Sequence, residues 1–420
     1  MNKQLNKLLT ARCKSPLGGF RGLLRGLLSL LLFLSLLGCK EEGRIDHIDS
    51  AGPAPAQIDM ATITWRGTPG GAVLKYRLPA DIDNLHYVKA EYELQSGVVR
   101  QTKASCYEDS LVLDGFGDTR TYEVKIYSVG KNEKASEPVT VSVTPTTAPV
   151  HMATANLKEA FGGVSVVVEN PMKATLAIEL MGDTAQLGYQ TKLATFYISK
   201  EKQTFNFRGL DTIAGNFSVY MRDRWNNLSE TGNATLTPWY EEFIPKNTWR
   251  ELILPTDREA YSTQFRLSNA WNGNITSESM FVSTYGGVYP FWFTWDLGVT
   301  IIMSRLTMYW TPTRTPYTEG MLKDFELYGS INPTPDGSWD ENWIPLGRFE
   351  CLRPSGLAIS TDDDIAFARQ GFGFDLETNE FAPDPFVPIR YIRIKANNAY
   401  HFPSVNCYLQ EISFWGLIQK

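Results

Sequence analysis

The sequence predicts an all-β protein of several modules, and three observations carry this prediction. No segment with a convincing helical period follows residue 40, whereas short β-branched and aromatic runs alternate there with clusters of Gly, Pro, Asn and Asp. Two successive stretches open in the same way, with a glycine pair that leads into a strand-like run. The chain has 420 residues, too many for one hydrophobic core, so two to four domains are expected.

Composition narrows the class of function. Hydrophobic residues make up 43% of the chain and charged residues 20%, as in a folded globular protein. The net charge of -6 leaves no domain-sized basic surface, which argues against nucleic acid as a partner. The five cysteines are widely spaced and form no Cys-x-x-Cys metal or redox pattern. Cys351 and Cys407 could pair if their strands are neighbours, which the sequence leaves open.

Residues 1–38 are typical of an export signal. A basic segment without acids precedes the apolar run 27–37, which is too short to span a bilayer comfortably. The run ends in Gly38-Cys39, which resembles the lipobox of bacterial lipoproteins, where the cysteine is acylated and becomes the new N-terminus. The resemblance implies that Cys39 anchors the protein in the cell outer membrane. The alternatives are an ordinary secretory signal or a membrane anchor.

Residues 39–57 are interpreted as a tether. They contain two prolines and several charges but no apolar period. Residues 40–43, Lys-Glu-Glu-Gly, resemble the surface-export signal of lipoproteins in gut-type Gram-negative bacteria. This resemblance implies that the protein faces the cell surface.

The first module spans residues 58–146. Residues 72–78 and 87–94 alternate apolar and polar side chains, and residues 122–129 form the clearest strand. About seven short strands in this length resemble a fibronectin type III-like sandwich.

The second module spans residues 153–238 and repeats the opening of the first at Gly162-Gly163. The two modules are therefore predicted to be diverged repeats of one fold. The charged cluster at residues 222–225 is interpreted as a structural turn with paired charges rather than a binding patch.

The third module, residues 241–420, carries the sharpest motifs. They are Trp292-x-x-x-Asp296-Leu297-Gly298, then Ser330-x-x-x-x-x-Asp336-Gly337-x-Trp339, then Arg390-Tyr391-Ile392-Arg393-Ile394 and a closing Leu409-x-Glu411-Ile412-x-x-x-Gly416. In this order and spacing they resemble the discoidin domain, also called the coagulation factor V/VIII type C or galactose-binding-like domain. The resemblance implies an eight-stranded jelly-roll β-sandwich with loops clustered at one end. Trp292, Trp295 and Trp310 lie on or beside predicted strands and are assigned to the core.

A lipobox, two fibronectin-like modules and a discoidin-like end together resemble the surface lipoproteins of Gram-negative polysaccharide-utilisation systems. This resemblance implies a non-catalytic protein that captures polysaccharide or oligosaccharide for an outer-membrane glycan importer. The alternative is an adhesin or structural subunit that binds a protein partner, which would show a wide apolar patch.

No sequence motif argues for an enzyme. Gly-x-Ser-x-Gly, His-Glu-x-x-His and the phosphate-binding Gly-rich loops are absent. Acids are too plentiful for the sequence to exclude the carboxylate pair of a glycosidase, but three β-modules leave no room for a catalytic domain. Residues 362–364, three consecutive aspartates, are interpreted as a solvated loop rather than a cation site.

One loop supports a calcium hypothesis. Residues 270–276 resemble the loop that holds a structural calcium in sugar-binding discoidin-like domains, and Glu411 lies where that family has its C-terminal ligand. The ligands implied by this resemblance are Asn272, Asn274, Thr276 and Glu411. Asn272 stands where the family has Asp, and a neutral oxygen weakens the site. The alternative is a metal-free turn held by Asn side-chain hydrogen bonds.

The sugar site is predicted at the loop end of the third module, on residues 284–290, 311–320 and 397–406. A pyranose ring stacks its C–H face on an aromatic ring, and its hydroxyls need donors and acceptors. Tyr317 and Tyr400 are the predicted stacking residues. The full set of candidates is Tyr285, Arg314, Tyr317, Asn398, Tyr400 and His401.

Overall fold

A computed structural model describes residues 52–80, 82–94, 97–184, 186, 188–379, 381, 387–400 and 405–419. The predicted export signal, Cys39 and His401 lie outside these residues. Almost all regular structure in the described ranges is β-strand, arranged in packed sheets, so the all-β prediction is confirmed. Within the same ranges, no helix combines the length and the apolar character that crossing a bilayer requires.

The first module is a sandwich of two antiparallel sheets, with strand orders β1-β2-β5 and β4-β3-β6-β7. In β6, Tyr122, Val124 and Ile126 are buried while the residues between them are exposed, which is the alternation visible in the sequence. The inward faces of the two sheets share one hydrophobic core. The elements are η2 (Met60–Thr62), β1 (Thr64–Thr68), β2 (Gly71–Lys75), β3 (Leu85–Glu93), β4 (Val99–Ser105), β5 (Ser110–Asp114), β6 (Tyr122–Gly130) and β7 (Val139–Val143).

The second module has the same topology, with strand orders β8-β9-β12 and β11-β10-β13-β14. Position for position this is the order of the first module, as the repeated glycine-then-strand opening predicts. It has a separate core. The elements are α2 (Pro149–Met152), β8 (Thr154–Ala160), β9 (Gly163–Glu169), β10 (Leu176–Gly182), β11 (Thr191–Ile198), β12 (Lys202–Arg208), β13 (Gly215–Arg222) and β14 (Gly232–Leu236).

The C-terminal domain is organised around β18 (Phe291–Tyr309). One end of this strand pairs with β16 and β22, and the other end pairs with β21 and β24, so a single strand contributes to both layers. The pairing with β22 shifts register between Asp296 and Ile301, where Gly298 adopts a φ of +73°. A Cβ at Gly298 would lie 2.4 Å from the carbonyl oxygen of Thr248, so the bend requires glycine.

The remaining elements of this domain are β15 (Glu242–Phe243), η3 (Lys246–Thr248), β16 (Arg250–Leu252), η4 (Thr263–Phe265), η5 (Leu267–Trp271), β17 (Phe281–Val282), β19 (Leu322–Ser330), β20 (Ile344–Glu350), α3 (Asp362–Gln370), β21 (Phe372–Asp375), β22 (Ile389–Ala399), β23 (Tyr408–Leu409) and β24 (Glu411–Ile418).

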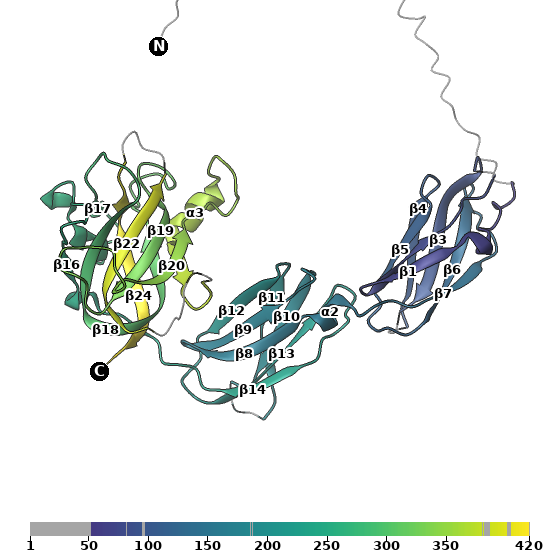
Figure 1. Cartoon of the computed structure of the whole chain (residues 1–420), viewed down its shortest axis with the longest axis horizontal. Coiled ribbons are helices and arrows are strands. Elements are labelled where there is room, and N and C mark those ends of the chain that lie inside the picture. The colour runs from purple at the N-terminus through teal and green to yellow at the C-terminus, as the bar shows by residue number, and fades with distance from the viewer. Residues whose placement is uncertain are drawn as a thin grey trace, which may run out of the picture.

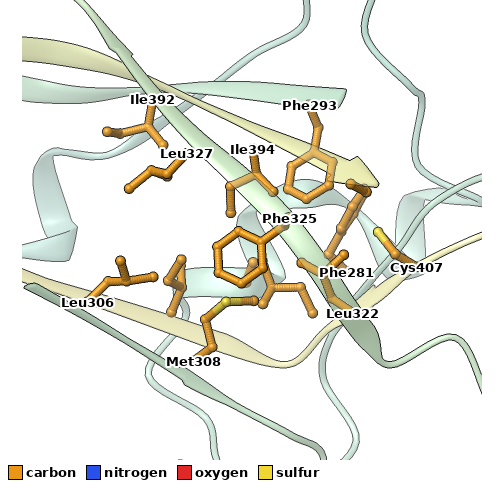
Figure 2. Packing of buried hydrophobic residues seen from close by; sticks show 14 of the residues in the cluster. Phe281, Phe293, Leu306, Met308, Leu322, Phe325, Leu327, Ile392, Ile394 and Cys407 are labelled. Atoms are coloured by element: carbon orange, nitrogen blue, oxygen red, sulfur yellow. The ribbon is translucent and has the colours of Figure 1, made fainter. Parts of the chain in front are cut away.

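Large apolar side chains from both layers fill the core of the C-terminal domain. Figure 2 shows Phe325 of β19 in the middle of this cluster, with Ile394 on one side and Met308 on the other. Trp295 and Trp310 are buried, as predicted. The core assignment of Trp292 is wrong, because strand alternation turns its side chain to the opposite face of β18, where it packs edge-on against Trp339 with ring centroids 5.2 Å apart.

Helix α3 was not expected from the sequence, and the solvated-loop interpretation of residues 362–364 is wrong. These aspartates form the first turn of α3, where carboxylates favour a helix N-terminus. Thr361 and Asp364 form a reciprocal capping box: the Thr361 hydroxyl accepts from the Asp364 N–H at 3.2 Å, and Asp364 Oδ2 accepts from the Thr361 N–H at 2.8 Å.

The three units lie in a row, with the C-terminal domain at one end and the first module at the other (Figure 1). Residues 222–225 form a turn that joins the first two modules, consistent with their interpretation as a structural turn. There Trp225 packs on Gly115, where a Cβ would lie 2.9 Å from the indole, and Asn227 Nδ2 donates to the Gly115 carbonyl at 3.1 Å. Arg224 pairs with Asp114 at 2.9 Å.

An ion network joins the second module to the C-terminal domain. Arg208 of β12 binds three carboxylates: Glu241 at 2.9 Å, Asp375 at 2.8 Å and Glu377 at 2.6 Å. Arg305 of β18 also pairs with Glu241, at 3.1 Å. Two guanidinium groups therefore face three half-buried or buried carboxylates. Burial raises the pKa of Glu377 to about 7, against the opposing effect of Arg208.

Candidate functional site

The predicted sugar-binding loops lie side by side at one end of the C-terminal domain. The Gly286 N–H donates to the Val405 carbonyl at 3.0 Å, which joins the first loop to the third. The Gly320 N–H donates to the Tyr400 carbonyl at 3.1 Å, which joins the second to the third. The three segments therefore meet at this end of the domain, although residues 397–399, predicted as part of a loop, form the end of strand β22.

The prediction that Tyr317 and Tyr400 stack on a sugar is wrong, because the structure buries both rings. Tyr317 is 2% exposed and Tyr400 is 9% exposed, so neither offers a ring face to a ligand. The segment between β20 and α3 covers them: the Tyr317 hydroxyl donates to the Asp364 carbonyl at 3.2 Å, and the Tyr400 hydroxyl donates to the Cys351 carbonyl at 2.8 Å. The Arg353 guanidinium lies 5.1 Å from the Tyr317 ring centroid and adds a cation–π contact.

Tyr285 and Tyr261 instead form the exposed aromatic corner at this end. Tyr285 is 39% exposed and Tyr261 54% exposed, and their rings meet edge to face with centroids 4.9 Å apart. The Tyr285 and Tyr408 hydroxyls are 2.9 Å apart. Burial of the hydroxyl, together with this hydrogen bond, raises the pKa of Tyr285 to about 12, so the phenol stays protonated and can donate.

Arg314 lies beside this corner and is held between two carboxylates. Its Nη2 binds Glu278 Oε1 at 2.5 Å, and its Nη1 binds Glu319 Oε2 at 2.8 Å. Its guanidinium carbon lies 5.3 Å from the Tyr408 ring centroid. The guanidinium offers N–H donors in a fixed fork and the two carboxylates offer acceptors, all next to an aromatic ring, which suits the recognition of a sugar.

A hollow of about 570 Å³ adjoins the aromatic corner. Arg258, Glu259 and Ser262 line it, whereas Tyr261 and Tyr285 do not. Arg258 links the hollow to the first loop, because its Nη2 donates to the Gly286 carbonyl at 2.8 Å. Asn398, the remaining described candidate, is exposed in β22 opposite Asp324 of β19. The site therefore combines an exposed aromatic edge, paired charges and a recess.

Of the residues at this corner, the sequence analysis named Tyr285 and Arg314 as candidates but not Tyr261, Glu278 and Tyr408. Tyr261 lies in an irregular segment before η4, so a composition rule that favours aromatics in polar loops could have found it. Glu278 comes from the Ser-rich stretch before β17 and meets Arg314, which is 36 positions away in the chain. A local sequence pattern could not predict that two residues so far apart in the chain form an ion pair.

The structure places the predicted calcium ligands in one turn and its surroundings, and the side-chain oxygens of Asn272, Asn274 and Glu411 accept hydrogen bonds from backbone N–H groups there. Asn272 Oδ1 accepts from the Asn274 N–H at 2.8 Å, and Asn274 Oδ1 accepts from the Thr276 N–H at 3.0 Å. Glu411 Oε2 accepts from the Gly273 N–H at 3.0 Å. These are the hydrogen bonds of a turn held by its own Asn side chains. The residues present therefore do not fit a calcium ion.

Three family models match the chain, and each match lies mainly within one of the three structural units. Models of three families, each described as a domain of unknown function, match the chain: DUF4959 over residues 55–145, DUF5126 over residues 144–247 and DUF5000 over residues 271–416. No curated protein matches the sequence.

Several solved structures are similar to parts of the chain. A protein named "SusE-like protein BT2857" has 27% identity over 63% of this chain and 97% of its own, with a TM-score of 0.43. The galactose-bound family 32 carbohydrate-binding module of NanJ from C. perfringens has 14% identity over 42% of this chain and 98% of its own, with a TM-score of 0.28. A two-domain fibronectin type-III segment of chicken tenascin has 14% identity over 44% of this chain and 99% of its own, with a TM-score of 0.21.

Proposed function

We propose that this chain is a non-catalytic glycan-binding protein whose sugar site is the loop end of the C-terminal domain. The observation that carries the proposal is the exposed corner of Tyr285 and Tyr261 beside Arg314. The face of an exposed aromatic ring can stack on the apolar face of a pyranose ring, while the guanidinium and its two carboxylates bind hydroxyls. Because both Glu278 and Glu319 bind the same guanidinium, neither carboxyl group is left free to act as the general acid of a glycosidase.

The test is glycan binding by the full chain, measured by calorimetry. A polysaccharide panel gives the ligand, and galactose, the sugar bound to the C. perfringens module described above, is the first single sugar to try. Tyr285→Ala and Tyr261→Ala should each weaken binding by about 1–3 kcal/mol, by analogy with aromatic stacking on nucleic-acid bases.

Tyr107→Ala is the matched control for these variants. Tyr107 is 90% exposed on the first module, far along the chain from the loop end, so its loss should leave affinity unchanged. Full affinity in a folded Tyr261/Tyr285 double variant would place the sugar site elsewhere.

The proposal extends to the cell surface. Acylation at Cys39 would hold the protein in the outer membrane, and the two sandwich modules would carry the sugar site away from it. Presentation of polysaccharide to an outer-membrane importer is the role that this arrangement serves. The lipobox residues Gly38-Cys39 support the anchor, and the order of the three units supports the role.

One surface favours a second function, the binding of a protein partner. The connection from β20 to α3 and the helix itself expose four apolar side chains: Leu352 at 47%, Leu357 at 57%, Ile359 at 83% and Phe367 at 42%. Exposed apolar side chains that cluster in one segment are characteristic of a protein interface. If this face binds an importer subunit, Ile359→Asp should abolish co-purification of the two proteins and leave glycan affinity unchanged.

A further inference from the structure

We propose that Lys246 and Gln410 replace a metal ion in the loop of residues 272–279, so that the C-terminal domain folds and functions without calcium. The loop matches the pattern of a calcium site in sequence. The contacts around it show that the place of the cation and the roles of its oxygen ligands are already taken by side chains of this chain.

The ammonium group of Lys246 takes the place of the cation. Its Nζ contacts Glu411 Oε1 directly, while Glu411 Oε2 accepts from the loop at the Gly273 N–H. Lys246 is 15% exposed and Glu411 2% exposed, so the pair is nearly removed from water. Lys246 is the first residue of η3 and lies 165 positions from Glu411 in the chain. A buried carboxylate needs one paired cation, and here the ammonium group of Lys246 is that cation.

Gln410 engages three backbone carbonyls of the loop with the two N–H groups of its amide. Its Nε2 donates to the carbonyls of Asn274 at 2.7 Å, Ser277 at 2.9 Å and Ser279 at 3.2 Å. Calcium takes six to eight oxygen ligands, often including backbone carbonyls. The three acceptors also fix the orientation of the amide, because the reverse orientation would set its oxygen against three other oxygens. Gln410 is fully buried, so this hydrogen bonding is not exchanged with water.

The neutral side chains of the loop agree with this replacement. Asn272 stands at the position where an acidic ligand would add charge, and its oxygen is turned to a backbone N–H instead. Glu278, the one carboxylate within residues 272–279, pairs with Arg314. With Lys246 and Glu411 also paired, no unpaired negative charge is left in the loop for a divalent ion. The proposal is independent of the sugar site, since it concerns how the domain is held together.

The experiment is calorimetric melting of the full chain in detergent, with calcium alone or with EDTA. A native calcium site filled at about 100 times its Kd would raise the melting temperature of its domain by about 5–10 °C. The replacement predicts the same melting temperature in both buffers. A rise of that size in calcium, or a calorimetric titration with one calcium bound per chain, overturns the proposal.

Variants test the ammonium directly. Lys246→Met should lower the melting temperature by about 10 °C, because it leaves Glu411 buried without a cation. Adding Glu411→Gln to Lys246→Met should recover part of this loss, since the uncompensated charge is then gone. Lys395→Met is the matched control: Lys395 pairs with Glu326 at 3.1 Å in the same domain, but both side chains are about one quarter exposed. Equal losses in Lys246→Met and Lys395→Met overturn the role of Lys246, and if Lys246→Met does not fold, the calcium melt of the unaltered chain decides.

Discussion

Replacing Arg208 by methionine should loosen the joint between the second module and the C-terminal domain. The guanidinium is 20% exposed and binds Glu241, Asp375 and Glu377, which are 11%, 25% and 5% exposed. Methionine keeps much of the side-chain volume but leaves these carboxylates facing one another. Removing one partner of a buried ion pair costs about 3–5 kcal/mol.

The expected cost lies at the lower end of that range, about 3 kcal/mol. Arg305 still neutralises Glu241, and Asp375, the most exposed of the three carboxylates, can regain water. For units of this size, 3 kcal/mol corresponds to a fall of about 6–12 °C in melting temperature. Calorimetry of the full chain measures it, and the second module and the C-terminal domain should then melt in separate steps rather than together.

Arg224→Met is the matched control, because it breaks the ion pair at the other joint. Arg224 is 68% exposed and Asp114 32% exposed, so this pair should contribute at most about 1 kcal/mol. If the two variants melt alike, the network around Arg208 is an ordinary surface feature and the argument for a fixed joint fails.

Two further predictions follow from the structure, and a third follows from the sequence. The folded-state pKa of Glu377, about 7, exceeds its ordinary value, so its contribution to stability is full below pH 4.5 and is lost as pH rises through 7. Melting between pH 5 and 8 should show this loss, at most about 1.4 kcal/mol for each pH unit. Glu377→Gln should abolish the pH dependence. Tyr317→Ala should destabilise the C-terminal domain by about 3–5 kcal/mol in urea unfolding, as for a core aromatic, and a loss no larger than that of the exposed Tyr107→Ala would contradict its burial. Cys39→Ala should shift the protein from the detergent to the aqueous phase or block its processing, and unchanged partitioning would rule out the anchor.

The fold could be predicted because its information is local. Alternation of period two along β6 marks the buried Tyr122, Val124 and Ile126, and the glycine-then-strand repeat marks the second module. The same rule places Trp292 on the face opposite Trp295, so its assignment to the core was avoidable. Helix α3 could also have been predicted from the sequence, since Thr361 and Asp364 have the spacing of a capping box.

The site was predictable only in part, because its decisive contacts are non-local. Loop composition indicates where Tyr285 and Arg314 lie, but nothing near Tyr317 in sequence shows that the connection to α3 covers it. The loop of residues 272–279 matches a calcium motif locally, yet the side chain that occupies the cation position comes from η3. Charge pairing across such separations is a property of the fold, and a motif match cannot report it.

The two joints have a consequence for glycan capture. Each is built from specific contacts at defined positions, ion pairs between Arg208 and its carboxylates at one and the packing of Trp225 on Gly115 at the other, rather than from a flexible linker. A flexible stalk would lose conformational entropy each time a polysaccharide engaged both the sugar site and a neighbouring importer, whereas a stalk of fixed angles has already lost it on folding. Ion networks also set an angle more sharply than a flat apolar contact, because Asp375 and Glu377, once displaced, lose the Arg208 guanidinium that neutralises them. If presentation to an importer is the function, Arg208→Met should weaken uptake of the polysaccharide by cells and leave its affinity for the purified protein unchanged.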